Sequence, residues 1–349
     1  MTSINAIRFN DYSGAMVCDE QRGWNPENMI INSADKIKPV IPDYITKEQG
    51  IVACYGNTGT STIGDELKFN IRKRIQTEYD SLKEKINKIP DKFTTISELA
   101  KWAFEAQTKL KRDHIDQTIS GRHGFTTNDL IRGFYNKDSQ KVEIKDSTTI
   151  NSIHDAMTWK GRTGEMTSVF LNAGIIAGYD PEEGFRIFSL SMIEYGYYPV
   201  QEIFLADGSG RDLATLYLTE YSNRKTVPER RSAIHRTEGI FEMINAVNAA
   251  CRHDIGVEGY LNIILFDGHE PVERRMRTIN DDRSKLATEI VRAWENRFLD
   301  RSKALEFVEA LIWSDTSWNV IDENFWKSVS NPDALLDIFR GYPEPKTSE

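Results

Sequence analysis

The order in which the hydrophobic period changes along the chain constrains its fold more than any single motif does. Apolar and polar residues alternate from Ile4 to Phe9. A turn at residues 10–14 then leads into a second short apolar run, 15–18, which ends at Asp19. This pattern predicts an N-terminal hairpin in which successive side chains point to opposite faces of a sheet.

A helical period replaces the strand pattern after a buried strand at 51–55. Apolar residues recur every four positions from Ile63 through a charged segment that reaches about Lys88, and Pro90 ends the helix. A second helix is expected over 98–110, with Ser97 as its N-cap.

The same succession of strands and helices then occurs a second time. We expect strands at 169–178, 185–190 and 201–205, helices at 212–219 and 237–251, and a last strong strand at 259–266. Strands, two helices, strands, two helices and a strand are not the alternating βαβ units of a parallel sheet. The predicted fold is therefore α+β, a four-layer α/β/β/α sandwich.

This layered pattern covers only part of the 349 residues. We assign residues 2–268 to the sandwich domain and treat the polar stretch at about 112–165 as an insertion, with some helix around 128–135. Residues 269–349 are charged and helical in period, notably at 285–299 and 303–312. They are expected to form a helical C-terminal extension that ends in a disordered tail.

Composition narrows the classes of partner and compartment. The formal net charge of −9 argues against nucleic acid and against an anionic membrane surface. Three scattered cysteines fit a reducing compartment, and no Cys or His spacing matches a metal site. With no signal peptide and no apolar run long enough to span a bilayer, a cytoplasmic protein is expected that needs no cofactor and no metal.

Thr2 is the first candidate for catalysis. Aminopeptidases remove Met1 when a small residue follows, and the mature chain would then begin with a hydroxyl and a free α-amine on one residue. Such a pair can serve as nucleophile and base. Asp19 and Lys36 follow on strands expected nearby, although either could be a solvated or turn-capping residue, and Lys38 shares a face with Lys36.

Four segments taken together resemble the proteasome-type N-terminal nucleophile (Ntn) hydrolases, in particular proteasome β-subunits. They are Thr2–Ile4 with Asp19 and Arg22, Asp35–Ile37, Val52–Asn57 opening a long helix, and Ile175–Asp180 joined to Ala206–Gly210. The resemblance runs from Thr2 to about Gly268 and leaves the C-terminal region uncovered.

The resemblance implies cleavage of an amide bond through an acyl-enzyme on Thr2. The α-amine, whose ordinary pKa is about 7.7–8.0, would accept the hydroxyl proton. Lys36 would stabilise the alkoxide, Asp19 would hold Lys36 charged and oriented, and a turn at Gly56 would supply oxyanion donors. Water would release the product of a hydrolase, and an amine would release that of a transpeptidase.

Ser209 and Asp254 are the supporting residues that the resemblance implies. The chain departs from the family pattern around them, because Arg211 replaces a second serine and Val257 replaces a serine near Asp254. Asp19 is also displaced by one residue relative to the nucleophile. These departures motivate an alternative from another class, a catalytically inactive structural or binding subunit.

The resemblance also implies partners. We expect a peptide or protein substrate, a closed homo-oligomer and a regulatory or substrate-delivery partner. An amidase that acts on a small molecule stays open, because the substrate pocket cannot be derived from these residues.

Overall fold

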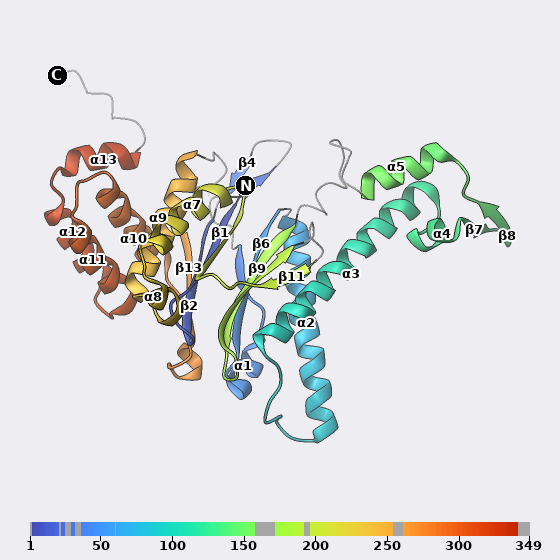
Figure 1. The fold of residues 1–349 in the computed structure, drawn as a ribbon, viewed down its shortest axis with the longest axis horizontal. Helices are drawn as coiled ribbons and strands as arrows, with labels where there is room; N and C mark the ends of the chain where they lie inside the picture. Colours follow the sequence, from blue (N-terminus) through green and yellow to red (C-terminus); the bar gives the residue numbers. More distant parts are fainter. Residues whose placement is uncertain are drawn as a thin grey trace, which may run out of the picture.

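In the computed structural model, residues 2–20, 22–24, 29–31, 36–59, 61–157, 172–191, 196–253 and 261–340 are described. They form a mixed α/β fold built on two antiparallel five-stranded sheets (Figure 1). The α+β class predicted from the sequence is confirmed at this level. Within these residues, no helix is both long and apolar enough to cross a bilayer.

The first sheet carries the N-terminal hairpin at its centre. Its strands are, in spatial order, β12 (Phe204–Gly208), β1 (Ser3–Arg8), β2 (Ser13–Asp19), β13 (Leu261–Asp267) and β14 (Met276–Thr278). The predicted hairpin is confirmed, with Ile4 opposite Cys18 and Ile7 opposite Ala15. A strand on either side of it ties down a chain terminus that would otherwise fray.

The second sheet faces the first. Its spatial order is β11 (Gly196–Pro199), β10 (Gly184–Ser191), β9 (Ala173–Asp180), β6 (Val52–Thr58) and β5 (Ile37–Pro39). An apolar cluster fills the space between the sheets, with Ile4 and Met16 on one side and Cys54 and Ile175 on the other. Residues two apart along a strand supply this cluster because side chains alternate between the two faces.

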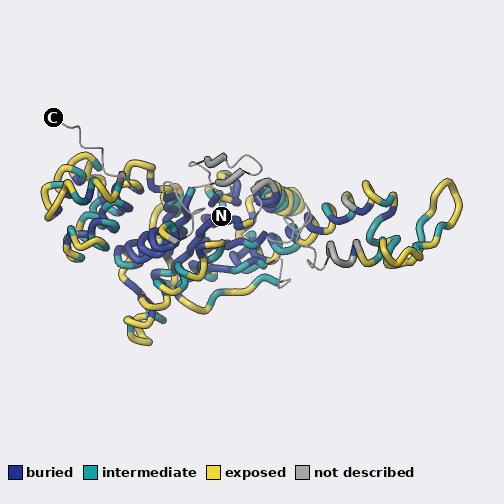
Figure 2. Tube along the Cα trace, turned by 90° about the horizontal axis from the view of Figure 1, so that it is seen from above, coloured by how far each residue is buried: buried dark blue, intermediate teal, exposed yellow. Residues whose placement is uncertain are grey.

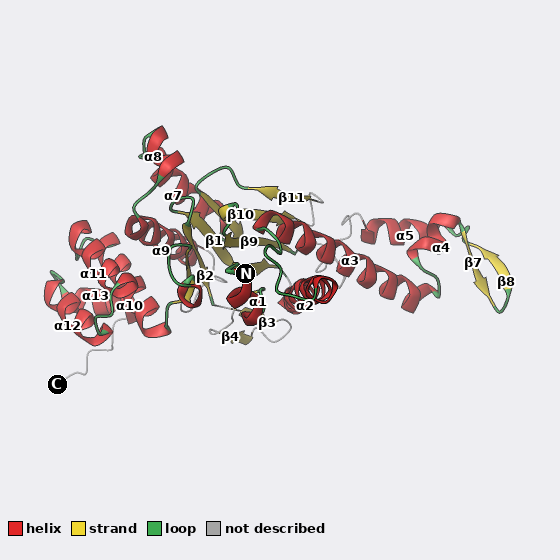
Figure 3. Ribbon diagram, turned by 90° about the horizontal axis from the view of Figure 1, so that it is seen from below, coloured by secondary structure: helices red, strands yellow, loops and turns green. Residues whose placement is uncertain are grey.

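Helices cover the outer face of each sheet (Figures 1 and 3). Helices α2 (Ser61–Ile86) and α3 (Ile96–His123) pack on the second sheet, and α7 (Arg211–Asn223) and α9 (Arg236–His253) pack on the first. Two separate apolar clusters lie beneath these helix pairs. Figure 2 shows the buried residues concentrated in this central part of the molecule.

Short elements connect these layers. They are β3 (Arg22–Trp24), β4 (Met29–Ile31), α1 (Asp43–Gln49), α8 (Val227–Ser232) and the 3-10 turn η1 (Val272–Arg274). The strand pattern did not predict α1, which occupies the connection between β5 and β6.

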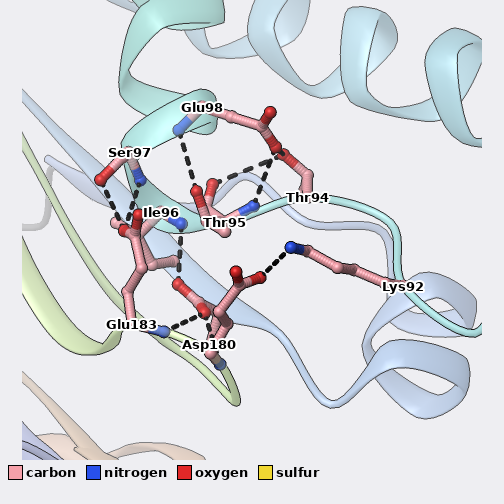
Figure 4. Close-up of polar contacts among 9 residues, drawn as sticks. Lys92, Thr94, Thr95, Ile96, Ser97, Glu98, Asp180 and Glu183 are labelled. Carbon is pink, nitrogen blue, oxygen red and sulfur yellow. Dashed lines mark hydrogen bonds and ion pairs between the residues drawn. The ribbon is translucent and has the colours of Figure 1, made fainter.

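The start of α3 differs from the prediction. Thr95, not Ser97, is the N-cap: its side chain accepts from the N–H of Glu98, and the Glu98 side chain accepts from the Thr95 N–H. This reciprocal pair satisfies two N–H groups that the helix leaves unbonded. Asp180, at the end of β9, accepts the Ile96 N–H at 2.8 Å (Figure 4). The second sheet and α3 are therefore joined by a buried carboxylate.

The predicted insertion is more structured than its polar composition indicates. Helix α3 extends to His123 instead of ending at Leu110, and α4 (Thr127–Arg132), the hairpin of β7 (Phe134–Lys137) and β8 (Gln140–Glu143), and α5 (Ser147–Met157) follow. A small cluster of its own holds this part together: Ile115, Ile119, Phe125 and Ile153. It projects from the sandwich in Figure 1.

The C-terminal region is helical, as expected. It contains α10 (Asp281–Glu295), α11 (Arg301–Trp313), α12 (Trp318–Ser328) and α13 (Pro332–Arg340). Its apolar residues belong to the same cluster as those of α9 and the first sheet. The tail predicted to be disordered, from Pro343, lies outside the described residues.

Candidate active site around Thr2

Thr2 is held by the turn that follows β12. Its backbone nitrogen donates to the Ser209 hydroxyl at 3.0 Å, and its carbonyl oxygen accepts the Gly210 N–H at 3.3 Å. Gly208 has a φ of +102°, and a β-carbon there would lie 2.0 Å from the Thr2 carbonyl oxygen. The turn therefore requires glycine at 208 in order to approach Thr2 so closely.

Ser209 lies beside the start of the chain and does not cap the helix that follows it. The N-cap of α7 is Gly210, not Ser209. The Ser209 hydroxyl instead contacts the backbone nitrogen of Thr2, the atom that would become the α-amine once Met1 is removed.

Asp19 connects the start of the chain to Lys36. The carboxylate is fully buried, and its Oδ1 accepts the Ser3 N–H at 2.8 Å. Its Oδ2 accepts from the Lys36 ammonium at 2.7 Å. Burial raises the pKa of Asp19, and the charge and hydrogen bond of Lys36 act against that rise. The structure thus brings together Asp19, Lys36 and the residue that follows Thr2.

The two candidate lysines have different environments. The Lys36 side chain is 8% exposed and paired with Asp19, whereas the Lys38 side chain is 42% exposed and lies 3.8 Å from Asp65. Lys38 is thus a solvated strand residue with a weak ion pair. Of the two, Lys36 alone combines burial with proximity to the start of the chain.

A second buried lysine lies behind the site, and the sequence analysis did not identify it. Lys68, on α2, is 6% exposed and donates from its ammonium to the Lys36 carbonyl oxygen at 3.0 Å. The Asn57 N–H donates to the same oxygen at 3.3 Å. These two bonds fix the backbone of Lys36. The only signal in the sequence is that Lys68 directly follows Leu67 on the apolar face of a helix.

Gly56 does not form the turn that the sequence analysis assigned to it. The strand β6 continues through Thr58, and Gly56 pairs with Ile37 on one side and Ile175 on the other. A β-carbon at Gly56 would lie 2.9 Å from the Ile4 side chain in the facing sheet. Close packing of the two sheets, rather than a tight turn, explains this glycine.

The structure describes some, but not all, of the other residues discussed around the site. Asp254, Val257 and Met1 lie outside the described residues. Arg211 is the first residue of α7, its side chain is 61% exposed, and it lies 3.5 Å from Asp212. The residue that replaces the second serine thus has a largely solvent-exposed side chain.

Asp207 is a second residue that the sequence analysis missed. Its Oδ2 accepts from the Thr58 hydroxyl at 3.0 Å, and its Oδ1 accepts the Gly208 N–H at 2.8 Å. Burial raises the pKa of Asp207, while these two hydrogen bonds act against that rise. It stands two residues before Ser209, which the resemblance had already singled out.

The described residues of the site have the components of nucleophilic chemistry. In the ranges that the structure describes, no three His, Cys, Asp or Glu side chains gather closely enough to hold a metal ion. The arrangement offers a hydroxyl, a backbone nitrogen in contact with a serine, and a buried lysine paired with a carboxylate.

Comparison with known proteins adds evidence on the fold. No family model and no curated protein matches the chain. Two solved structures of Anbu from Hyphomicrobium sp. strain MC1, one a Gly-1 mutant, are similar to it, with TM-scores of 0.53 and 0.51 at 12% and 11% identity. They cover 85% and 84% of this chain and 96% and 94% of their own.

These comparisons correct the family assignment made from the sequence. The resemblance indicated proteasome β-subunits, but no family model of that or any other kind matches, and the two similar structures given above are Anbu proteins. At this low identity the likeness concerns the fold alone. The chain is therefore similar in fold to Anbu, which is proteasome-related, and its fold is proteasome-like.

Proposed function

We propose that the chain is an N-terminal threonine hydrolase, activated by removal of Met1, that cleaves peptide or amide bonds through an acyl-enzyme on Thr2. One observation carries this proposal. The buried Asp19 carboxylate bonds the N–H of Ser3 with one oxygen and the Lys36 ammonium with the other. A desolvated lysine and its counterion are thus held one residue from the candidate nucleophile.

The proposed chemistry assigns each group a task. The Thr2 hydroxyl attacks the carbonyl carbon, and the α-amine takes the hydroxyl proton and returns it to the leaving amine. The Lys36 charge stabilises the developing alkoxide, and Asp19 keeps Lys36 in place. Ser209 orients the α-amine through its 3.0 Å contact. Asp254 stays a proposed supporting residue, and the oxyanion donor is not assigned because Gly56 lies within its sheet.

The proposal also covers the architecture of the chain, its location and its partners. The three apolar clusters, one between the sheets and one beneath each helix pair, support the four-layer α/β/β/α arrangement. A sandwich domain over residues 2–268 and an extension over 269–349 remain our division of the chain. A cytoplasmic location, a homo-oligomer and a substrate-delivery partner likewise remain proposals.

A catalytically inactive structural or binding subunit is the second candidate. The observation in its favour is Arg211, whose largely exposed side chain occupies the position where the resemblance places a second serine beside the nucleophile. Under this alternative the buried Asp19–Lys36 pair would only stabilise the fold.

Intact-mass spectrometry combined with a β-lactone probe separates the two candidates. The enzyme hypothesis predicts a mass that lacks Met1 and covalent labelling that is lost in Thr2→Ala and retained in Thr2→Ser, which keeps a hydroxyl. Met1 retained in full, or equal labelling of Thr2→Ala and the unmodified protein, would reject Thr2 as the nucleophile. Ser3→Ala is the control, because it changes the residue next to Thr2 and leaves the Thr2 hydroxyl in place.

A further inference from the structure

A hydrogen bond joins the two sheets at the edge of the candidate site. Asp207 is opposite Ile4 in the first sheet, and Thr58 is the last residue of β6 in the second. The Thr58 hydroxyl donates to Asp207 Oδ2 at 3.0 Å across the gap between the sheets. The other carboxylate oxygen accepts the N–H of Gly208 at 2.8 Å, so the same side chain also bonds the last residue of its own strand, where the 208–210 turn begins.

That turn is the one that holds Thr2. Gly208, which bonds Asp207, lies very close to Thr2. A β-carbon at this position would lie 2.0 Å from the Thr2 carbonyl oxygen. Ser209 contacts the Thr2 nitrogen at 3.0 Å, and Gly210 donates to the Thr2 carbonyl at 3.3 Å. Any shift of the turn would therefore move both contacts to Thr2.

We propose that Asp207 and Thr58 form a clamp that fixes the 208–210 turn against the second sheet and thereby orients Thr2 for attack. Asp207 is a positioning residue in this scheme, because it acts on Thr2 through Gly208, Ser209 and Gly210. The inference rests on the proposed function and adds to it two residues that neither the sequence nor the resemblance assigned.

The position of Thr2 at the start of the mature chain explains why such a clamp would be needed. Removal of Met1 would leave Thr2 attached to the chain on one side only, so hydrogen bonds from the turn must supply the missing restraint. A half-buried carboxylate is costly when its oxygens lack hydrogen bonds, and here the N–H of Gly208 and the hydroxyl of Thr58 each supply one bond. Because small misplacements of a reacting group are expensive in rate, a loosened turn would slow acylation.

The test uses Thr58→Val, which removes the hydroxyl at nearly constant shape, and Thr58→Ser, which restores it. Acylation by a β-lactone is followed by mass spectrometry and resolved into an apparent binding constant and a maximal rate. We expect Thr58→Val and Asp207→Ala each to lower the maximal rate about tenfold, with the binding constant little changed. We expect Thr58→Ser to react as the unmodified protein does.

A double-mutant cycle tests whether Asp207 and Thr58 act through one shared hydrogen bond. If Asp207 and Thr58 act through a single bond, Thr58→Val in the Asp207→Ala background should cost little more than Asp207→Ala alone. Fully additive losses, or a maximal rate in Thr58→Val equal to that of Thr58→Ser, would overturn the clamp. Melting temperatures of all variants show whether each one folds.

Hydrogen exchange provides a readout that does not depend on activity. Loss of the clamp should speed amide exchange in the peptide that spans the 208–210 turn, in Thr58→Val but not in Thr58→Ser. Equal exchange in the two variants would reject the inference even if Thr2 is catalytic. Faster exchange in Thr58→Val, with no labelling of any variant, would uphold the clamp and reject the hydrolase function.

Discussion

At the scale of single residues, the proposed mechanism requires Lys36 to have a role that nearby Lys38 does not have. Lys36 is buried against Asp19, whereas Lys38 is largely solvated and only weakly paired. We predict that Lys36→Met lowers the rate of β-lactone labelling by at least about 100-fold, because a charge next to the developing alkoxide is lost. Lys38→Met should stay within about twofold. Similar losses in both variants would mean that Lys36 has no special role.

The same substitution has a consequence for stability that depends on pH. Burial already raises the pKa of Asp19, and Lys36→Met removes the strongest interaction that opposes that rise, leaving the hydrogen bond from the Ser3 N–H. Above the folded-state pKa, Lys36→Met leaves a buried carboxylate uncompensated, and we expect a loss of about 3 kcal/mol in unfolding free energy. As the pH falls through that pKa, Asp19 becomes protonated in the folded state and the loss should shrink. Urea unfolding at several pH values measures this, and a loss independent of pH would contradict it.

Part of the candidate site could be predicted from the sequence. Thr2, Asp19 and Lys36 were singled out by the resemblance to the Ntn hydrolases, and the structure places Asp19 against Lys36 and the Ser3 N–H. Lys68 and Asp207 could not be predicted, because the partner of Lys68 is the backbone carbonyl of the residue before β5 and that of Asp207 is a hydroxyl in the facing sheet. Such contacts arise from tertiary packing and leave no pattern in the local sequence.

At the scale of elements, the N-terminus of α3 shows how a carboxylate at the end of a strand supports a long helix. Asp180 accepts the N–H of Ile96 with one oxygen and the N–H groups of Glu182 and Glu183 with the other (Figure 4). The carboxylate is fully buried, and its bond to the Ile96 N–H is shielded from water. The carboxylate also lies at the positive end of the helix dipole.

We therefore predict that Asp180→Ala lowers the unfolding free energy by about 3 kcal/mol, because three backbone donors lose a charged acceptor. Glu182→Gln is the matched control. Its side chain is half exposed and pairs with Lys92, so the loss should stay below about 0.5 kcal/mol. Chemical denaturation measures both variants, and equal effects would show that Asp180 is not an anchor of α3.

The boundaries of elements were harder to predict than their order. The sequence contains the capping box of Thr95 and Glu98, but Ser97 is also a preferred N-cap residue, so the sequence alone does not decide between the two positions. The sequence pattern underestimates the length of α3 because its second half is polar and packs on the small cluster around Ile119 and Phe125. Periodicity detects a helix best where one face is continuously buried.

At the scale of the whole molecule, the C-terminal helices are part of the main core. Glu242, on α9, is 2% exposed and pairs with Arg301 at 2.8 Å and with Arg224 at 3.6 Å. Arg301 is the first residue of α11, so this buried carboxylate bonds the extension to the sandwich. The helical period of the extension could be predicted from its sequence, but this long-range packing could not.

We predict that Glu242→Gln lowers the unfolding free energy by about 3 kcal/mol, because two arginines lose a buried counterion. A single cooperative transition should remain, since α9 and α11 share one apolar cluster. Glu306→Gln is the control, because Glu306 is exposed on α11 and pairs only locally with Lys303. A separate early transition in Glu242→Gln, seen by calorimetry, would show instead that the extension folds independently.

The most direct measurement of the central claim is the structure of the adduct formed with a peptide epoxyketone. This warhead closes a ring only when a hydroxyl and a free α-amine belong to the same residue, which is the proposed state of Thr2 once Met1 is removed. Tandem mass spectrometry of the labelled N-terminal peptide should place both new bonds on Thr2. An adduct on any other residue, or an unmodified N-terminal peptide after full exposure to the probe, would contradict the account.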